Sequence, residues 1–317
     1  MPASLDDWQR SDLALADSVA LACLLEATAP KAGNVHPRAS FSDMNYQHFV
    51  ASAAALAGVV REVIPRQSAG QIVLACVQAT QKTVGRNTNL GTILLFGPLV
   101  KAANVAQAKV HSLERLRGNV EQVLRELSAK DSADVYQAIV ESKPGGMGEQ
   151  TENDIRSNAP DRLVDAMTQV ADFDAVARQY ANGFADCFER LLPWLQESLS
   201  ALGNLPESER ILEATCWTQL RWLAYEPDGL IHRKVGAEQA KEVQQRAKDV
   251  LDDLTRSGRG HESDSATLST ADSYAQLDRY LRSYGNRLNP GTTADLIAAT
   301  LLILLLTKNE KSFNDQP

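Results

Sequence analysis

The stretch "NTNLGTILLFGPL", Asn87 to Leu99, indicates the fold class. It begins with polar residues of the kind that cap helices and then becomes almost wholly apolar, with no charged residue. A helix with apolar residues on all sides belongs in the interior of a large helical protein. We therefore expect a helix from about Leu90 to Val105, with its apolar part in the core and its polar start at a ligand-binding surface.

Length, composition and net charge limit the number of domains and the kinds of partner that this chain can have. The 317 residues are enough for one large domain or two ordinary ones, and 44% of them are hydrophobic, so a full core is expected. The formal charge is −8 and the pI is about 5.2, which argues against nucleic acid as a partner, because binding to its phosphates needs a cationic face. A small anionic ligand is compatible with this charge, since a local basic pocket or a bound Mg²⁺ reverses the field.

Cysteine usage and the most apolar segments bear on the compartment. All four cysteines lie in helix-like apolar stretches without a Cys-x-x-Cys pair, so we expect buried, reduced thiols. The start "MPASLDDWQRSD" shows no basic region followed by an apolar run, and no signal peptide is predicted. The segment Leu296 to Leu306 is shorter than the roughly 20 residues that a membrane span needs. We expect a cytoplasmic protein without membrane contact.

Apolar residues recur at helical spacing along nearly the whole chain, and the alternation typical of strands is nearly absent. Helices are expected at 11–30, 46–65, 68–85, 90–105, 113–127, 132–140, several between 163 and 199, 208–225, 233–258, 271–283 and 292–307. No internal repeat and no linker rich in Pro, Gly or Ser divides the chain. The pattern predicts one all-α domain over 1–317, with about a dozen helices and functional residues at helix junctions.

Five helix junctions interrupt this pattern and mix glycine with Asp, Asn, Lys or Arg. They are residues 26–44, 85–91, 142–155, 226–236 and 286–296. Ordinary turn chemistry explains any one of them. Taken together they favour a phosphorylated ligand, because helix N-termini offer unpaired N–H groups and the positive end of the helix dipole. Basic residues at these junctions are expected to neutralise phosphate, namely Lys31, Arg38, Lys143, Arg233 and Lys234.

The same junctions resemble the signatures of the triphosphoribosyl-dephospho-CoA synthase family, in a form similar to its divergent, archaeal-type branch. The matches, in chain order, are Glu26 with "PKAGNV" and Asp43-Met44; Asn87, Thr88 and Gly91; "KPGGMGE"; "DGLIHRKVG"; and "NPGTTADL". Together they span residues 26 to 296. The resemblance implies an all-α enzyme that transfers the triphosphoribosyl group of ATP to a hydroxyl of dephospho-CoA and releases adenine.

The resemblance and the residue types together give a candidate site. Displacing adenine from ribose builds positive charge on the sugar, which nearby carboxylates stabilise, while one of them deprotonates the attacking hydroxyl. The expected catalytic residues are Glu26, Asp43 and Asp228. The expected substrate- or phosphate-binding residues are Lys31, Gly33, Asn87, Thr88, Gly91, Lys143, Gly145, Gly146, Arg233, Lys234, Asn289 and Thr292. Mg²⁺ is expected at Asp43, Asp154, Asp228 and Asp295, because it prefers carboxylate and phosphate oxygens. A homodimer is a further expectation.

One departure from the family pattern leaves alternatives open. Asn89 and Leu90 stand where the citrate-lyase branch usually has His and Lys. The alternative acceptor belongs to one-carbon, tetrahydromethanopterin-type cofactor biosynthesis. A further alternative is a non-enzymatic nucleotide-binding or scaffold protein, which predicts that the junctions scatter over the surface. A prenyl-diphosphate synthase is discounted, because "DDWQR" and "DDLTR" lack the third acid of its metal-binding motif.

Overall fold

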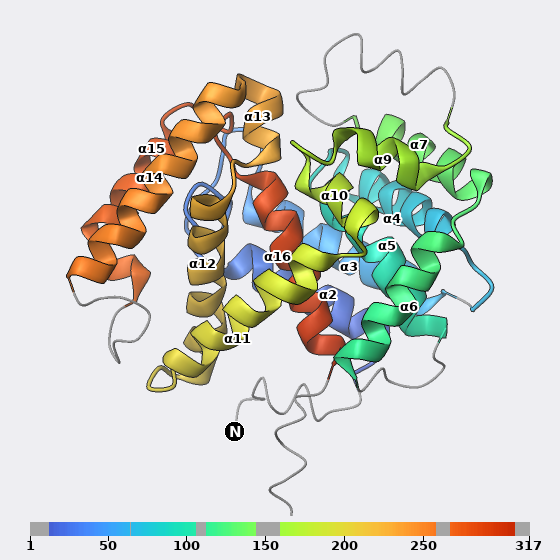
Figure 1. The fold of residues 1–317 in the computed structure, drawn as a ribbon, viewed down its shortest axis with the longest axis horizontal. Coiled ribbons are helices and arrows are strands. Elements are labelled where there is room, and N and C mark those ends of the chain that lie inside the picture. Colours follow the sequence, from blue (N-terminus) through green and yellow to red (C-terminus); the bar gives the residue numbers. More distant parts are fainter. Residues whose placement is uncertain (1–12, 64, 106–111, 144–158, 258–266, 308–317) are drawn as a thin grey trace, which may run out of the picture.

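The computed structural model describes residues 13–63, 65–105, 112–143, 159–257 and 267–307. Within these ranges the chain forms 14 α-helices and no β-sheet, which confirms the predicted all-α class (Figure 1). The first six are α2 (Leu15–Thr28), α3 (Tyr46–Arg61), α4 (Ala69–Val84), α5 (Leu90–Val105), α6 (Leu113–Arg125) and α7 (Ala129–Ser142). The remaining eight are α9 (Leu163–Val170), α10 (Ala175–Asn182), α11 (Leu192–Ala201), α12 (Glu207–Tyr225), α13 (Gly229–Val235), α14 (Ala237–Arg256), α15 (Asp272–Arg282) and α16 (Gly291–Leu306).

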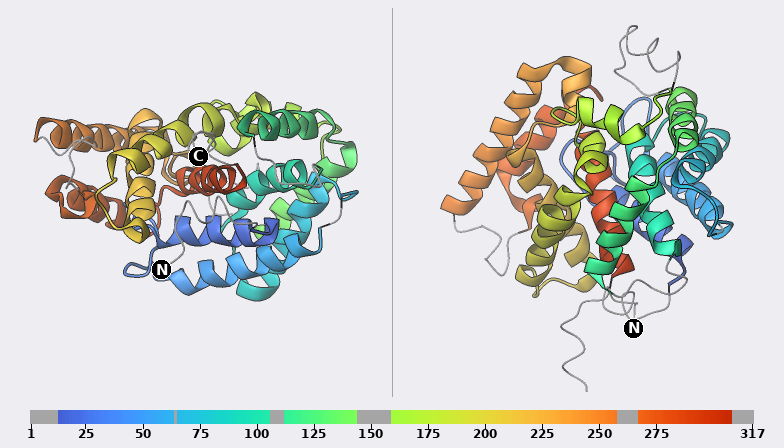
Figure 2. Two further views of the ribbon diagram at one scale, coloured as in Figure 1. Left: turned by 90° about the horizontal axis from the view of Figure 1, so that it is seen from below. Right: turned by 45° about the vertical axis from the view of Figure 1, so that its right-hand side comes forward.

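Helix α16 lies at the centre of the molecule. Its residues from Leu296 to Leu304 are almost completely buried, because the sequence "LIAATLLIL" is apolar on every side and needs neighbours on every side. It packs against α2 and α5 on one side and against α10, α11 and α12 on others, as Figures 1 and 2 show. The N-terminal end of this central helix, at Gly291, opens into the site described below.

Helix α5 is the second buried helix, and it contains a proline. Pro98 has no N–H to donate to the carbonyl of Leu94 one turn earlier, which would leave that buried group unpaired. The hydroxyl of Tyr180, on α10, donates to the Leu94 carbonyl at 2.6 Å instead. The side chain of Tyr180 is 2% exposed, so this long-range hydrogen bond fixes α10 against the middle of α5.

Two expected helices are divided in the structure. The helix expected over 233–258 is α13 followed by α14, because Gly236 between them has a φ of +96° that the helix cannot accommodate. The region expected to be helical up to 199 is broken after α10, where Gly183 and Phe184 both have positive φ angles. A short π-helical turn, Cys187–Leu191, then leads directly into α11.

The prediction of buried cysteines is confirmed. All four cysteines are free and buried, which agrees with the predicted reduced thiols.

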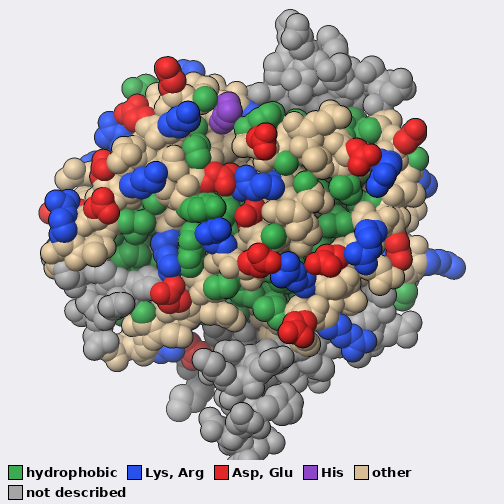
Figure 3. Space-filling model, in the orientation of Figure 1, with side chains coloured by type: hydrophobic (Ala, Val, Ile, Leu, Met, Phe, Trp, Pro, Cys, Tyr) green, Lys and Arg blue, Asp and Glu red, His purple; other side chains and the backbone are tan. Residues whose placement is uncertain are grey.

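No helix among the described residues is long and apolar enough to cross a membrane. On the face shown in Figure 3, basic side chains alternate with acidic ones and do not gather into an extended patch of one sign.

Candidate functional site

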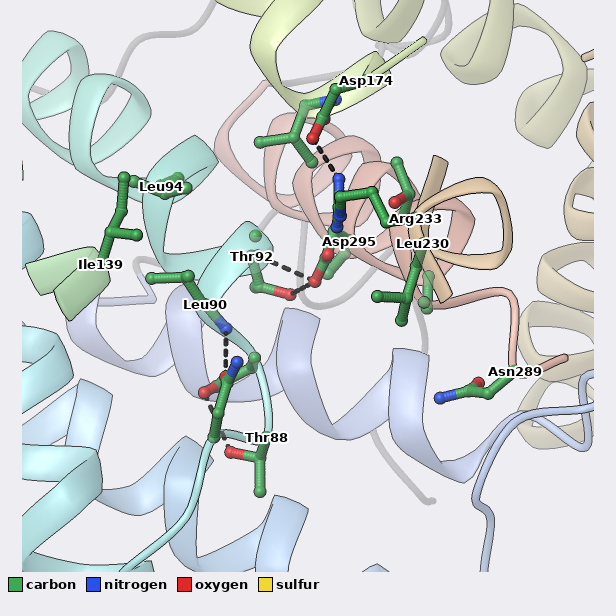
Figure 4. A pocket seen from close by; sticks show the side chains of 18 of the residues that line it. Thr88, Leu90, Thr92, Leu94, Ile139, Asp174, Leu230, Arg233, Asn289 and Asp295 are labelled. Carbon is green, nitrogen blue, oxygen red and sulfur yellow. Dashed lines mark hydrogen bonds and ion pairs between the residues drawn. The ribbon is translucent and has the colours of Figure 1, made fainter. Parts of the chain in front are cut away.

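One cavity of about 840 Å³ lies between the starts of α5 and α16 and the helices α2, α7, α9, α10 and α13 (Figure 4). Residues from all five of the junctions singled out in the sequence line it, although the third contributes only Lys143 among the described residues. A scaffold with dispersed junctions would not show this convergence.

Most of the expected site residues line this cavity. They are Glu26, Asp43, Asn87, Thr88, Gly91, Lys143, Arg233, Lys234, Asn289, Thr292 and Asp295. The cavity wall does not include Lys31, Gly33, Arg38 or Asp228. Three further expected residues, Gly145, Gly146 and Asp154, lie outside the described residues.

The N-terminus of α5 binds a carboxylate of the protein itself. The amide and the hydroxyl of Thr92 both donate to Oδ1 of Asp295, at 2.8 and 2.7 Å (Figure 4). A Cβ atom on Gly91 would lie 2.0 Å from Oδ2 of the same carboxylate, so only glycine admits Asp295 here. Burial raises the pKa of Asp295 to about 7, with the nearby charge of Glu26 adding to the rise and the Thr92 hydrogen bonds opposing it.

These contacts change the role expected for "NTNLG". The Leu90 amide donates to Oδ1 of Asn87 at 3.0 Å, and the Thr92 amide is engaged by Asp295. Thr88 shares a 2.6 Å hydrogen bond with Ser52 on α3 and donates to Asn89. The amides of Leu90 and Thr92 therefore satisfy protein side chains and not the phosphate that the sequence suggested.

The "PKAGNV" turn is buried beneath the cavity. Lys31 is 0% exposed, and its Nζ lies 2.8 Å from Oε1 of Glu26 and also donates to the Glu26 backbone carbonyl. Gln219 on α12 donates to the Ala32 carbonyl and to Oδ1 of Asn34, which fixes the turn from below. Lys31, expected to bind phosphate, instead compensates the buried charge of Glu26 and holds that carboxylate at the cavity wall.

Asp228 lies behind the cavity wall and caps two helices. Its Oδ1 accepts from the amides of Leu230 and Ile231 at the start of α13, and its Oδ2 accepts from the amide and hydroxyl of Thr293 in α16. The residue is 2% exposed, and burial raises its pKa while the Thr293 hydrogen bonds oppose the shift. Since four donors already surround this carboxylate, the structure gives it a role in joining α13 to α16.

A polar rim surrounds the cavity mouth. Asn286 donates to Oδ2 of Asp43 at 2.9 Å and accepts from Lys234 Nζ at its side chain and backbone oxygens, while Arg86 donates to the Asp43 carbonyl. Burial lowers the pKa of Lys234. The cations Arg86 and Lys234 therefore stand close to Asp43, on segments far apart in the sequence.

An ion pair at the rim joins α13 to the start of α10. Arg233 contacts Oδ2 of Asp174, whose Oδ1 caps α10 by accepting from the amides of Val176 and Ala177 (Figure 4). The sequence reading did not select Arg86, Asp174 or Asn286 as site residues. Arg86 lies within the second junction, residues 85–91, and Asn286 is the first residue of the last junction, residues 286–296. Their position within these junctions was the signal that could have found them.

Comparison with known proteins identifies the family. The model of the ATP:dephospho-CoA triphosphoribosyl transferase family matches residues 12–313. The chain belongs to this family. It is a transferase, and the family activity is the transfer of a triphosphoribosyl group from ATP to dephospho-CoA. A search of curated proteins gives no significant match.

A solved structure from Archaeoglobus fulgidus is similar in fold. It is described provisionally as a triphosphoribosyl-dephospho-CoA synthase and is 21% identical to this chain, with a TM-score of 0.55. The match covers 82% of this chain and 98% of that one. At this identity the likeness supports the family fold and not the roles of individual residues.

One side of the cavity is apolar. Leu94 of α5, Ile139 of α7, Met167 and Val170 of α9 and Val176 of α10 contribute to its wall. Leu94 and Ile139 lie across the cavity from Leu230 and Asn289 (Figure 4). The polar rim and this apolar wall make the cavity amphipathic, as sites for nucleotides commonly are.

A bound metal ion needs several ligand atoms close together. No group of three His, Cys, Asp or Glu residues that could hold an ion occurs in the described part of the chain. Mg²⁺ bound with nucleotides takes one or two carboxylates and completes its shell with phosphate oxygens and water. Asp43, at the rim beside two cations, has the oxygen donors and the position for such a partial site.

Proposed function

We propose that this chain transfers the triphosphoribosyl group of ATP to a hydroxyl of dephospho-CoA, with release of adenine, in the cavity between α5, α13 and α16. The observation that carries the proposal is the convergence of the junctions on one amphipathic cavity that has cations at its mouth and carboxylates in its wall. Its volume of about 840 Å³ falls in the range of ligand sites for molecules of nucleotide size.

The triphosphate is assigned to the polar rim. Arg86, Lys234 and Arg233 present three cationic side chains from two separate segments, and Lys143 adds a fourth from the end of α7. Arg233 is paired with Asp174, so a phosphate oxygen would replace that carboxylate as the partner of the guanidinium. Holding the triphosphate, which stays on the transferred group, fixes the ribose in the cavity and lowers the entropic part of the barrier.

The ribose is assigned to the carboxylates of Glu26 and Asp295. Cleavage of the bond between ribose and adenine builds positive charge on the sugar ring. Glu26, with its charge compensated by buried Lys31, provides a fixed negative group at the wall where that charge develops. The adenine is assigned to the apolar wall formed by α5, α7 and α9.

Mg²⁺ is part of this proposal. Asp43 is the carboxylate best placed to bind it, because it lies on the rim that holds the phosphates. When bound, the ion would neutralise charge on the triphosphate. Arg86, Arg233 and Lys234 would orient the phosphates from the protein side.

The test is an assay for both products. The purified protein is incubated with ATP, Mg²⁺ and dephospho-CoA, and free adenine and triphosphoribosylated dephospho-CoA are measured by mass spectrometry. We expect both products in equal amounts. A matched reaction contains Arg233→Met, which keeps the length of the side chain without its charge; we expect a higher KM for ATP.

Two other outcomes redirect the proposal. If no adenine forms but ATP with Mg²⁺ raises the Tm, the nucleotide site stands and the acceptor is a different alcohol, such as one in one-carbon cofactor biosynthesis. If ATP neither reacts nor changes the Tm, the transfer reaction is refuted for this chain, and a scaffold becomes the better interpretation.

A further inference from the structure

The proposed function leaves open which group takes the proton of the attacking hydroxyl. Four carboxylates among the described residues line the cavity, namely Glu26, Asp43, Asp174 and Asp295. Asp174 is paired with the guanidinium of Arg233. Glu26 is paired with the buried ammonium of Lys31, and Asp43 lies on the exposed rim. In the described part of the chain, the hydrogen-bond partners of Asp295 are the amide and hydroxyl of Thr92, and no ammonium or guanidinium is among them.

We propose, resting on the proposed function, that Asp295 is the general base that accepts the proton of the acceptor hydroxyl and then delivers it to the departing adenine. It lies on the first turn of the central helix α16, in the wall between the rim and the apolar side. Its position is fixed from one side only, by the amide and hydroxyl of Thr92, both of which bind Oδ1.

The geometry leaves the second carboxylate oxygen for the substrate. Oδ2 of Asp295 packs over Gly91, where a Cβ would approach it to 2.0 Å, and both hydrogen bonds that the described residues make to this carboxylate go to Oδ1. A rigid helix start therefore holds one oxygen while the other faces glycine at the cavity wall. A proton acceptor needs this arrangement, because it must be within hydrogen-bond reach of the reacting group and must not reorient.

The step balances without any further reactant. The hydroxyl oxygen of the acceptor forms a bond to C1 of ribose, and the bond from C1 to the adenine nitrogen breaks, with its electron pair leaving on adenine. The hydroxyl proton passes to Asp295 and then to that nitrogen, so neutral adenine departs and the carboxylate is regenerated. Asp295 can accept the hydroxyl proton because the oxygen becomes strongly acidic as it bonds to C1, and it can return the proton because the adenine nitrogen becomes basic as its bond to C1 breaks.

The surroundings of Asp295 determine its titration. Glu26 and Cys23 of α2 lie close to Asp295. Arg233 of α13 lines the same cavity, and Asp228 lies behind the cavity wall. Burial and the negative charges of Glu26 and Asp228 favour the protonated form, whereas the two Thr92 hydrogen bonds favour the ionised form. Removing one of those hydrogen bonds should therefore raise the pKa further.

The experiment compares Asp295→Asn, Thr92→Val and Thr92→Ser with the wild type over pH 5 to 9. In single-turnover reactions with saturating ATP and dephospho-CoA, we expect the wild-type rate of adenine release to rise with pH to a plateau above a midpoint near 7. Asp295→Asn should lower the plateau about 10²- to 10⁴-fold and remove that midpoint. Thr92→Val should move the midpoint to higher pH, and Thr92→Ser, which keeps the hydroxyl, should restore it.

Binding of ATP in the presence of Mg²⁺ separates this role from a structural or metal-binding one. We expect Asp295→Asn to bind ATP with the wild-type Kd and to keep the wild-type far-UV spectrum. An active wild type with an unchanged rate and pH profile in Asp295→Asn would overturn the inference and leave the proposed function intact. Loss of Mg²⁺-dependent ATP binding in Asp295→Asn would also overturn it, in favour of a metal ligand. A wild type that releases no adenine would refute both proposals together.

Discussion

The starts of α5 and α16 use the same cap for different purposes. In each helix a threonine in the first turn, Thr92 or Thr293, donates its amide and hydroxyl to one oxygen of an aspartate from another part of the chain. The hydrogen-bond distances are the same, 2.8 Å from the amide and 2.7 Å from the hydroxyl in both. The difference lies in the second oxygen of each aspartate.

The second oxygen of Asp228 caps α13, so that carboxylate is enclosed by donors on both sides. The second oxygen of Asp295 lies over Gly91 at the cavity wall. Helix caps stabilise a fold by satisfying amides, and a carboxylate does this with one oxygen as well as with two. A capping carboxylate at a cavity wall, whose second oxygen receives no hydrogen bond from the described residues, can therefore serve as a positioned acid or base while it still caps the helix.

The largest expected effect on stability is at Asp228. Asp228→Ala leaves the amides of Leu230, Ile231 and Thr293 without their acceptor in a buried place, which should lower the free energy of unfolding by about 3 kcal/mol. Urea unfolding monitored by circular dichroism measures this. If Asp228→Ala does not fold, Asp228→Asn should fold with a smaller loss. A loss no greater than that of Asp295→Ala would contradict the structural assignment.

The next effect is the part of the pH dependence of stability that Asp295 contributes. Its pKa of about 7 in the folded protein exceeds that of an unfolded aspartate, so its stabilising contribution is complete below about pH 4 and is lost as the pH rises through 7. Relative to Asp295→Asn, the wild type should lose on the order of 3 kcal/mol between pH 4 and pH 8. Urea unfolding at several pH values checks this.

The comparison with Asp295→Asn is needed because another buried carboxyl titrates in the same range. Burial raises the pKa of Glu213 to about 7, but Glu213 is present in both proteins and its contribution cancels. A difference in stability that is constant from pH 4 to pH 8 would show that Asp295 ionises normally.

A smaller effect on activity is expected from Gly91→Ala. The new methyl group would displace Oδ2 of Asp295, so the rate of adenine release should fall at least about tenfold. Gly97→Ala in the same helix is the matched control, because its methyl group would press on Val73, and neither residue lines the cavity. That control should lose about 1–3 kcal/mol of stability without a tenfold loss of rate. Equal rates in the two variants would contradict the assignment of Gly91.

The smallest effect is expected from Thr293→Val. The side chain is 0% exposed and nearly isosteric with valine, so only the hydrogen bond to Asp228 is lost, and the free energy of unfolding should fall by about 1 kcal/mol. Urea unfolding at pH 8 gives this value. The pH profile of adenine release should keep its wild-type midpoint, in contrast to Thr92→Val. A shift of the midpoint in Thr293→Val would show that the two caps are not independent.

The fold could be predicted from the sequence because its signals are local. The apolar spacing and caps located α5 at the residues expected, and α16 within one residue. The break at Gly236 was missed, because a single glycine within a helical pattern is usually tolerated and its positive φ is not visible in the sequence.

The site could be predicted only as a set of segments. The glycine- and aspartate-containing junctions do meet, but their pairings depend on contacts between distant residues. Thr92 and Asp295 are 203 positions apart, and no local pattern links them. The burial of Lys31 was likewise not visible in the local sequence. A lysine in a Pro-Lys-x-Gly turn is normally solvated, and its burial against Glu26 depends on the packing of α2 and α12 around the turn.

The hydrogen bond from Tyr180 to the Leu94 carbonyl has a consequence for how the chain can change over time. With Pro98 present, losing the tyrosine hydroxyl leaves a buried carbonyl unpaired, whereas with an ordinary residue at 98 the helix supplies its own donor. Substitution of Tyr180 is thus tolerated only after Pro98 has been replaced, while Pro98 itself can change first. The two positions are therefore epistatic in one direction. The backbone N–H that Pro98 lacks determines the order in which residues 98 and 180 can be substituted.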